Sequence, residues 1–277
     1  MKKIFLLAIA FVMAACGGDE EVSNNQQQPT EWDTVTIRFS PYQVSEMTRA
    51  AISEYCTHLD VWITDGETTQ DFHQATGDDG FGSLSMTLNL TKSYTLYAVA
   101  HKANGPATLS NGVIAFPDDK VTHSFFVSRQ FTPTKGMSLE LMMNRIVAQF
   151  SFTTTDQVPD WCKTMRFTIS NVYDRWNVST GGTHQLDRVS TFNNFTTKND
   201  GTVTFNIYAI VTDASTNHTI LVEGLNADGD VQETHTLNNV PLQINHRTVA
   251  TGVFFSDAAS SFSFQAQDWG ADIDFGF

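Results

Sequence analysis

Hydrophobic and polar residues alternate with a period of two along most of the chain, which is the pattern of half-buried β-strands. The clearest examples are residues 35–39, 59–63, 84–90, 146–152 and 203–209. Shorter or less regular runs predict further strands at residues 94–101, 124–127, 137–142, 165–169, 219–222, 231–237, 248–255 and 262–266. Threonine, valine, phenylalanine and tyrosine dominate these runs, as suits a pleated surface. The pattern therefore predicts an all-β protein.

Turn signals separate the predicted strands, among them the Asp-Gly or Asn-Gly pairs at residues 65–66, 79–80, 111–112, 200–201 and 228–229. The best helical candidate is residues 45–55. Many short strands with regular turns are typical of sandwiches and barrels. The strands are too numerous for one small sandwich, so we expect two domains. The first spans residues 35–143 and the second spans residues 144–277.

The start of the chain has the features of a secretion signal. Met1-Lys2-Lys3 precedes an apolar run that ends at Ala15, and this run is shorter than the ~20 residues that span a bilayer. The stretch before Cys16 resembles the bacterial lipobox, which implies removal of residues 1–15 and acylation of Cys16. Palmitate and similar chains would then hold the protein at the cell outer membrane. The alternative is an ordinary signal peptide in which Cys16 has no special role.

The residues that follow Cys16 predict a surface-exposed tether. Residues 17–21 are small and then acidic, which resembles the signal that sends lipoproteins of Bacteroidetes to the outer face of the outer membrane. A solvated, charged linker is the simpler alternative. Residues 22–33 contain too few apolar side chains to fold. We therefore interpret residues 16–34 as a lipidated cysteine followed by a flexible tether.

Composition restricts the possible partners. The chain has 30 acidic and 16 basic residues, a net charge of −14 and a pI near 4.8. The basic residues are scattered along the sequence, which argues against nucleic acid as a partner and against binding to an anionic membrane surface. The acidity is consistent with solubility outside the cell.

No pattern in the sequence predicts catalysis. The chain lacks the GxSxG, Walker, HExxH and CxxC motifs, and its eight histidines show no helical ligand spacing. We therefore expect no enzyme activity, no cofactor and no metal. Cys56 and Cys162 could pair in an oxidising compartment, or they could be two separate buried thiols.

Three segments together resemble the fimbrillin superfamily of Bacteroidetes. They are residues 94–100 (YTLYAVA), residues 144–150 (NRIVAQF) and residues 241–252 (PLQINHRTVATG). Arg145, which opens the second predicted domain, and the Asn245-x-Arg247-Thr248 segment carry most of the resemblance. The resemblance implies two transthyretin-like Greek-key β-sandwiches in tandem and a structural or adhesive role in a fimbrium.

The resemblance also implies assembly with other fimbrial subunits by strand exchange, in which one subunit supplies a strand to its neighbour. In stalk subunits of this family a protease cuts after an arginine in the N-terminal part. The bond between Arg49 and Ala50 is the candidate here, although Arg49 could equally be an ordinary surface residue. An uncut chain would keep its lipid and act as an anchor, so stalk, tip and anchor roles stay open.

The C-terminus is a candidate donor strand. In an extended chain Ile273, Phe275 and Phe277 lie on one side, with Asp272 and Asp274 on the other. Such a tail could add a strand to a neighbouring subunit, or it could complete its own sheet. An unpaired apolar edge promotes aggregation unless assembly uses it.

A glycan-binding surface lipoprotein is the alternative function. Aromatic side chains stack on sugar rings when they are exposed on one face, and they pack into the core when they are not. The candidates are Trp161, Tyr173, Trp176, Tyr208 and Trp269.

Overall fold

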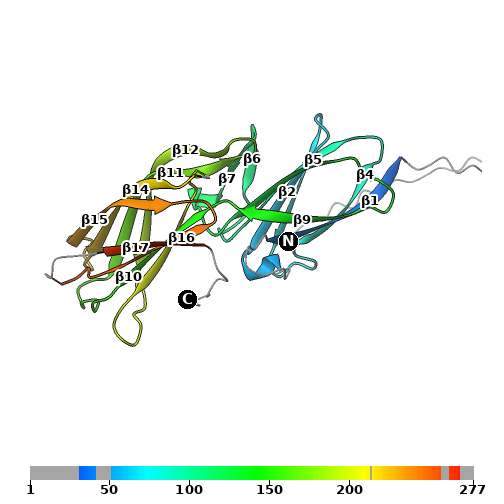
Figure 1. Cartoon of the computed structure of the whole chain (residues 1–277). Helices are drawn as coiled ribbons and strands as arrows, with labels where there is room; N and C mark the ends of the chain where they lie inside the picture. The colour runs from blue at the N-terminus through cyan, green and yellow to red at the C-terminus, as the bar shows by residue number, and fades with distance from the viewer. Residues whose placement is uncertain (1–30, 42–50, 213, 257–261, 269–277) are drawn as a thin grey trace, which may run out of the picture. The chain divides into compact units, whose positions relative to one another are not determined.

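The computed structural model describes residues 31–41, 51–212, 214–256 and 262–268, all within one compact unit (Figure 1). The described regular structure is β-strand except for two single 3₁₀ turns, Ile52–Glu54 and Pro117–Asp119. The prediction of an all-β protein is therefore confirmed. Of the helical candidate at residues 45–55, the described part forms only the first of these turns. No described helix is long and apolar enough to cross a membrane.

The N-terminal strands form one seven-stranded sheet that bends around a core. Its order is β3 (Thr69–Ala75), β2 (His58–Thr64), β5 (Tyr94–His101), β8 (Phe125–Phe131), β9 (Ser138–Arg145), β1 (Trp32–Pro41) and β4 (Ser83–Asn89). Strands β8 and β9 pair only at their ends, between Phe125–Phe126 and Asn144–Arg145. The sheet therefore bends at this point, and both halves contribute side chains to a shared core, for example Val35 of β1 and Leu96 of β5.

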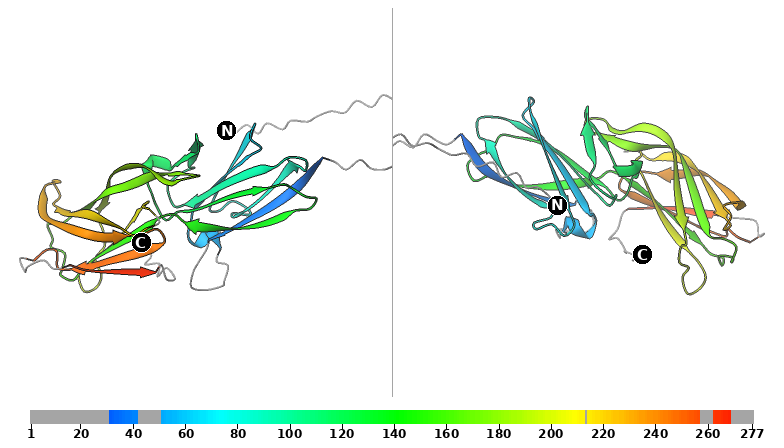
Figure 2. Two further views of the ribbon diagram at one scale, coloured as in Figure 1. Left: turned by 45° about the horizontal axis from the view of Figure 1, so that its top comes forward. Right: turned by 180° about the vertical axis from the view of Figure 1, so that it is seen from behind.

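The C-terminal strands form two sheets that face each other (Figure 2). One has the order β13 (Thr204–Ala209), β10 (Ala148–Thr154), β16 (His246–Gly252) and β17 (Phe262–Asp268). The other has the order β15 (Val231–Leu242), β14 (Thr216–Leu225), β11 (Thr164–Asn177), β7 (Val113–Ala115) and β6 (Thr108–Ser110), and β12 (Gly181–Asn193) pairs with β11. Alternate residues of the facing strands fill the core between them, with phenylalanines such as Phe152 and Phe167 at its centre.

One segment between β5 and β8 connects the two groups of strands. Its hairpin of β6 and β7 turns at Asn111 and Gly112, which both adopt the positive φ angles of a two-residue hairpin turn. Strand β7 then pairs with β11, so that Ile114 lies opposite Trp176. A third apolar cluster includes Trp62 and Val99 of the first group, Ile114 and Phe116 of the segment, and Ile146, Val147 and Ile210 of the second. The predicted domain boundary at residue 143 stays a prediction.

The two described cysteines do not pair. Cys56 and Cys162 are both buried free thiols, which settles the alternative that the sequence left open. Burial raises the pKa of the Cys56 thiol far above its ordinary value and raises the pKa of Cys162 to about 11. Both side chains therefore stay protonated and unreactive at neutral pH, and they serve as small apolar core residues.

Candidate functional site

Strand β1 lies inside the N-terminal sheet although it is the first described strand of the chain. It pairs antiparallel with β4, from Trp32 to Arg38, and parallel with β9, from Thr36 to Pro41. Figure 1 shows it in blue between these two strands. Without β1, the sheet would contain an open slot with unpaired backbone groups on both sides.

The inward side chains of β1 are part of the core. Val35 and Ile37 are completely buried and Phe39 is 5% exposed, whereas Arg38 between them faces solvent. They pack in the same cluster as residues of the flanking strands: Met86 and Leu88 of β4 and Leu141 and Met143 of β9. Because burial of one large apolar side chain contributes roughly 1.5–3 kcal/mol, any strand that replaced β1 would need apolar residues at every second position.

The register of β1 is fixed at its start. The carboxylate of Asp33 accepts hydrogen bonds from the backbone N–H of Gly136 (2.7 Å) and of Thr34 (2.9 Å). These bonds lower the pKa of Asp33, the bond from Gly136 contributing most. The Thr36 N–H donates to the Met137 carbonyl at 3.1 Å. The turn before β9 therefore holds β1 in one register, which matters because a shift by one residue would turn its apolar side chains outward.

Strand β17 is an edge strand of the C-terminal sandwich. It pairs with β16 from Phe262 to Asp268, and no strand in the described part of the chain pairs with its other side. Phe262 packs against Phe152, with ring centroids 5.4 Å apart, whereas Phe264 is 38% exposed. Within the described residues this edge therefore has no second partner strand, and it precedes the predicted donor residues in the chain.

A single carboxylate holds the segment that leads from β16 toward β17. The side chain of Asp156, just after β10, accepts hydrogen bonds from the backbone N–H groups of Phe254 (2.9 Å), Phe255 (2.6 Å) and Ser256 (3.0 Å). These three N–H groups come after the end of β16 and do not take part in its pairing with neighbouring strands. Asp156 therefore determines the path of the chain toward the edge strand.

We expect Asp156→Ala to lower the free energy of unfolding by about 2 kcal/mol, because it leaves the three backbone donors without their acceptor. Urea denaturation measures this value. The matched control is Asp160→Ala, which removes an exposed carboxylate nearby and should change the free energy by less than about 0.5 kcal/mol. Equal effects of the two substitutions would show that Asp156 does not hold this segment.

The two motifs that carry the family resemblance meet in the structure. Arg145 donates from Nε to His123 Nε2 (2.8 Å) and from Nη1 to Asn245 Oδ1 (2.9 Å). Its guanidinium lies over the ring of Phe125, 4.9 Å from the centroid. Asn245 has a positive φ of 60°, and its N–H donates to the Val147 carbonyl at 3.0 Å. Arg145 therefore ties β9 to the turn before β16.

His123 is held in its neutral form. Its Nε2 accepts the hydrogen bond from Arg145, and its ring stacks on Tyr208 at 5.5 Å. Burial and the neighbouring guanidinium keep the pKa of His123 well below its ordinary value of 6.5. The unfolded chain therefore binds a proton at this histidine as the pH falls below about 6.5, while the folded chain does not, so acid favours unfolding.

We expect the free energy of unfolding to fall by up to about 1.4 kcal/mol per pH unit below pH 6.5 through His123 alone. Urea denaturation at pH 7.5, 6.5 and 5.5 measures this loss. The variant His123→Gln cannot titrate and should show a shallower decline than the wild type. If the two proteins lose stability in parallel as the pH falls, His123 is not the group responsible.

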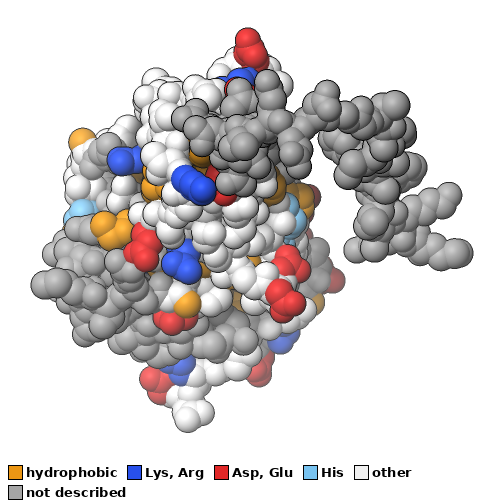
Figure 3. Space-filling view, turned by 90° about the vertical axis from the view of Figure 1, so that its right-hand side faces the viewer, with side chains coloured by type: hydrophobic (Ala, Val, Ile, Leu, Met, Phe, Trp, Pro, Cys, Tyr) orange, Lys and Arg blue, Asp and Glu red, His pale blue; other side chains and the backbone are white. Residues whose placement is uncertain are grey.

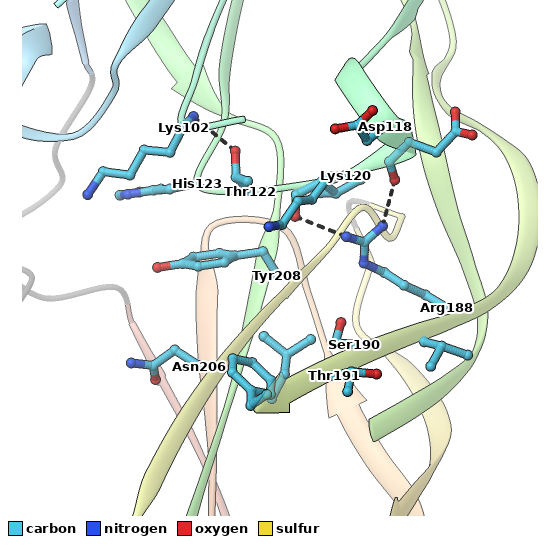
Figure 4. A pocket seen from close by; sticks show the side chains of 15 residues that line it. Lys102, Asp118, Lys120, Thr122, His123, Arg188, Ser190, Thr191, Asn206 and Tyr208 are labelled. Carbon is cyan, nitrogen blue, oxygen red and sulfur yellow. Dashed lines mark hydrogen bonds between the residues drawn. The ribbon is translucent and has the colours of Figure 1, made fainter. Parts of the chain in front are cut away.

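A cavity of about 520 Å³ opens between the edges of the two C-terminal sheets. Residues 188–192 of β12, residues 206–208 of β13 and residues 118–123 line it, together with Lys102 (Figure 4). Arg188 donates to the carbonyls of Asp119 (3.2 Å) and Val121 (3.1 Å), so it fastens this segment to β12. An apolar hollow of about 700 Å³ continues along the same two strands toward their connecting loop.

Most of the aromatic residues considered for glycan binding are not exposed. Trp161 packs against Phe255 and Trp176 against Phe126, in each pair with 5.8 Å between ring centroids. The other candidates, Tyr173 and Tyr208, are half-buried, and Trp269 lies outside the described residues. Among the described phenylalanine and tryptophan side chains, the exposed ones are instead Trp32 (53%) and Phe264 (38%), and the alternating pattern of the sequence did not distinguish them from core residues.

Charged side chains of both signs are interspersed on the face drawn in Figure 3, where the start of β1 lies. Over the ranges that the structure describes, no group of three or more histidine, cysteine, aspartate or glutamate residues is arranged to hold a metal ion.

Several predicted site residues lie outside the described residues. They are Cys16, Arg49, Ala50, Ile273, Phe275 and Phe277. Lipidation, processing and strand donation at these positions stay predictions. The structure does describe the strand that precedes Arg49 and the edge strand that precedes Ile273.

Solved structures of low sequence identity share the fold. A candidate adhesin from Bacteroides ovatus is 11% identical, with 84% of this chain and 95% of that chain covered and a TM-score of 0.54. A candidate adhesin from Bacteroides thetaiotaomicron is 10% identical, with coverage of 88% and 98% and a TM-score of 0.52. The fimbrial anchor protein Mfa2 from Porphyromonas gingivalis is 10% identical, with coverage of 86% and 98% and a TM-score of 0.47. The likeness to the two candidate adhesins is one of fold, and it agrees with the all-β architecture expected from the sequence.

No curated protein matches the chain. The family of unknown function DUF6562 matches residues 113–273, a range that begins at β7, the strand that joins the C-terminal sheet. Since this match covers more than half of the sequence, the chain belongs to the DUF6562 family.

Proposed function

We propose that this protein is a non-enzymatic, adhesive fimbrial subunit of a bacterial surface, and that its copies join by exchange of a β-strand. The observation that carries the proposal is the place of β1, between β4 and β9 with three buried apolar side chains. The strand next to β1 in sequence, β2, lies elsewhere in the sheet. Cleavage of the chain between β1 and β2 would therefore leave β1 attached to the protein by non-covalent contacts alone.

Processing after Arg49 would supply that cleavage. It would separate residues 16–49 from the body of the protein, and release of β1 would expose an apolar slot that an incoming strand could fill. Ile273, Phe275 and Phe277 of another copy have the alternate apolar spacing that such a slot requires. Before processing, an acyl chain on Cys16 would hold the protein in the outer membrane.

The test is treatment of the full mature chain with an arginine-specific protease. We expect cleavage after Arg49, a new N-terminus at Ala50 by mass spectrometry, and a ladder of polymers on unheated denaturing gels. Arg49→Ala should stay monomeric, whereas the matched control Arg129→Ala, at an exposed position of β8, should polymerise like the wild type. A chain that is cut at Arg49 and stays monomeric would contradict the proposal.

Two further variants separate the parts of the proposal. Phe275→Asp should be cut normally and fail to polymerise, because a charged side chain cannot enter an apolar slot. Unchanged polymers would show that the C-terminus is not the donor.

The variant Cys16→Ser cannot be acylated at this position, so we expect it to be lost from the outer membrane fraction. Its retention there would argue against a lipid anchor at this position.

A further inference from the structure

A buried carboxylate lies at the centre of a histidine cluster on the outer face of β2. Asp60 is 2% exposed, and its two oxygens accept hydrogen bonds from His73 Nδ1 (2.8 Å) and His101 Nε2 (2.9 Å). The backbone N–H of Ala107 donates to the same carboxylate at 3.0 Å. Since β2 lies between β3 and β5, Asp60 pairs with His73 on one side and the cluster extends to His101 on the other.

A third imidazole completes the cluster. His58 stacks on His73 with ring centroids 5.4 Å apart and on His101 with centroids 5.5 Å apart, at interplanar angles of 20° and 11°. The three rings thus form one stack with a single carboxylate beside it. Two or three protonated imidazoles in such a stack would repel each other at short range.

The cluster holds the segment that leaves β5 by its backbone. The N–H of Ala103 donates to His101 Nδ1 (3.2 Å), and the N–H of Gly105 donates to His58 Nε2 (3.3 Å). With the bond from Ala107 to Asp60, the backbone N–H groups of three alternate residues in this segment donate to side chains of the cluster. Ala103 and Ala107 are correspondingly buried, whereas Asn104 and Pro106 are exposed.

Two of these acceptors exist only while the imidazoles are neutral. His101 donates its Nε2 proton to Asp60, so its Nδ1 must be unprotonated in order to accept from Ala103. Similarly, His58 accepts at Nε2 and faces the Thr57 hydroxyl with Nδ1 at 3.0 Å. A second proton on either ring would turn the acceptor into a donor that faces another donor.

We propose that His58 and His101 form an acid-sensitive latch, in which protonation of His58 releases residues 102–107 from the sheet of β2 and β5. The segment that the latch holds continues into β6 and β7, and β7 pairs with β11 of the C-terminal sheet. Ala107 also belongs to the apolar cluster that both groups of strands share. Release of the latch therefore loosens the connection between the two groups of strands, while their separate cores stay intact.

The ionisable groups around His58 determine the direction of the effect. They are Asp60 on the same strand, His73 on β3 and His101 on β5, and residues 103–107 contribute none. Burial, and then the two neighbouring histidines, lower the pKa of His58 below 6.5, against the opposing influence of Asp60. The released form therefore binds protons more readily than the latched form. The latch is fully stable above about pH 6.5 and weakens as the pH falls below that value.

The test is hydrogen exchange of the full mature chain at pH 7.5 and pH 5.0, expressed as protection factors of individual amides. We expect the protection of the Ala103, Gly105 and Ala107 amides to fall severalfold at pH 5.0, because the released form binds the proton more readily than the latched form. Amides at the centre of the C-terminal core, such as those of Phe152 and Phe167, should keep their protection.

The variant His58→Gln keeps an acceptor at this position but cannot titrate, so its segment should lose less protection in acid than that of the wild type. The matched control His184→Gln changes an exposed histidine of β12, whose side chain is 56% exposed, and should leave the acid response unchanged. Equal protection at both pH values in the wild type would overturn the proposal. A parallel loss in the segment and in the core amides would also overturn it, because acid would then unfold the whole protein.

Discussion

Substitution of Ile37 by alanine is expected to lower the free energy of unfolding by about 3 kcal/mol, among the largest effects of any single truncation in this protein. Ile37 is completely buried at the centre of β1 and lies in the core cluster that β1, β4 and β9 share with β2, β5 and β8. The change removes apolar contacts and leaves a cavity that the flanking strands cannot close, because their backbones are fixed by pairing with β1.

Urea denaturation of the uncut chain measures this loss. The matched control is Arg38→Ala, one residue further along β1, which removes an exposed side chain and should change the free energy by less than about 0.5 kcal/mol. A loss below about 1 kcal/mol for Ile37→Ala would show that β1 contributes little to the folded state. The slot left by β1 would then need no replacement strand.

Removal of the Arg145 side chain, as Arg145→Ala, should lower the free energy of unfolding by about 3 kcal/mol, because it leaves one buried and one half-buried acceptor without their donor. These acceptors are His123 Nε2 and Asn245 Oδ1, which Arg145 reaches at 2.8 and 2.9 Å. The substitution also removes the cation–π contact between the guanidinium and the ring of Phe125. We expect a lower urea midpoint for this variant.

A surface ion pair provides the control for Arg145. Arg166 donates to both carboxylate oxygens of Glu223, at 2.7 and 2.9 Å, and its side chain is 35% exposed. Arg166→Ala should cost no more than about 1 kcal/mol, since solvent screens an exposed pair. Comparable costs at the two arginines would show that the contacts of Arg145 are not specially important for stability.

Alternation in the sequence predicted the strands that have one buried face. In β1 and β13, for example, the residues expected to face inward are the buried ones. It failed for β12, in which polar and exposed residues predominate over 13 positions. That strand is stabilised by backbone pairing with β11 along its length, and pairing leaves no periodic signal in the side chains.

The same limit applies to β11. The sequence predicts a strand at residues 165–169, whereas the observed strand continues to Asn177. A bulge between Ile169 and Val172 interrupts the alternation, and Asn171 within it has a positive φ of 55°. The additional residue of the bulge moves each following side chain to the opposite face of the sheet. The alternation of apolar and polar residues in the sequence therefore breaks at that point.

The sequence indicated some residues of the candidate sites but not others. Arg145 and Asn245 stand out as motif residues, but their direct contact joins positions 100 residues apart and depends on the fold. His58, His73 and His101 have no informative spacing. They meet because β2 is paired with β3 and β5 in a register that places His58 opposite His101 and Asp60 opposite His73. Strand order and register arise from long-range packing, which a single sequence does not display.

A covalent lock on β1 provides the most direct test of its role as a replaceable strand. The side-chain oxygens of Thr36 in β1 and Ser85 in β4 are 3.1 Å apart on the solvent face, so Thr36→Cys with Ser85→Cys places two thiols within bonding distance. After cleavage at Arg49, polymer formation is compared between the oxidised and the reduced double variant. Strand exchange predicts monomers in the oxidised sample and polymers once a reductant is added, whereas equal polymerisation in both samples would contradict it.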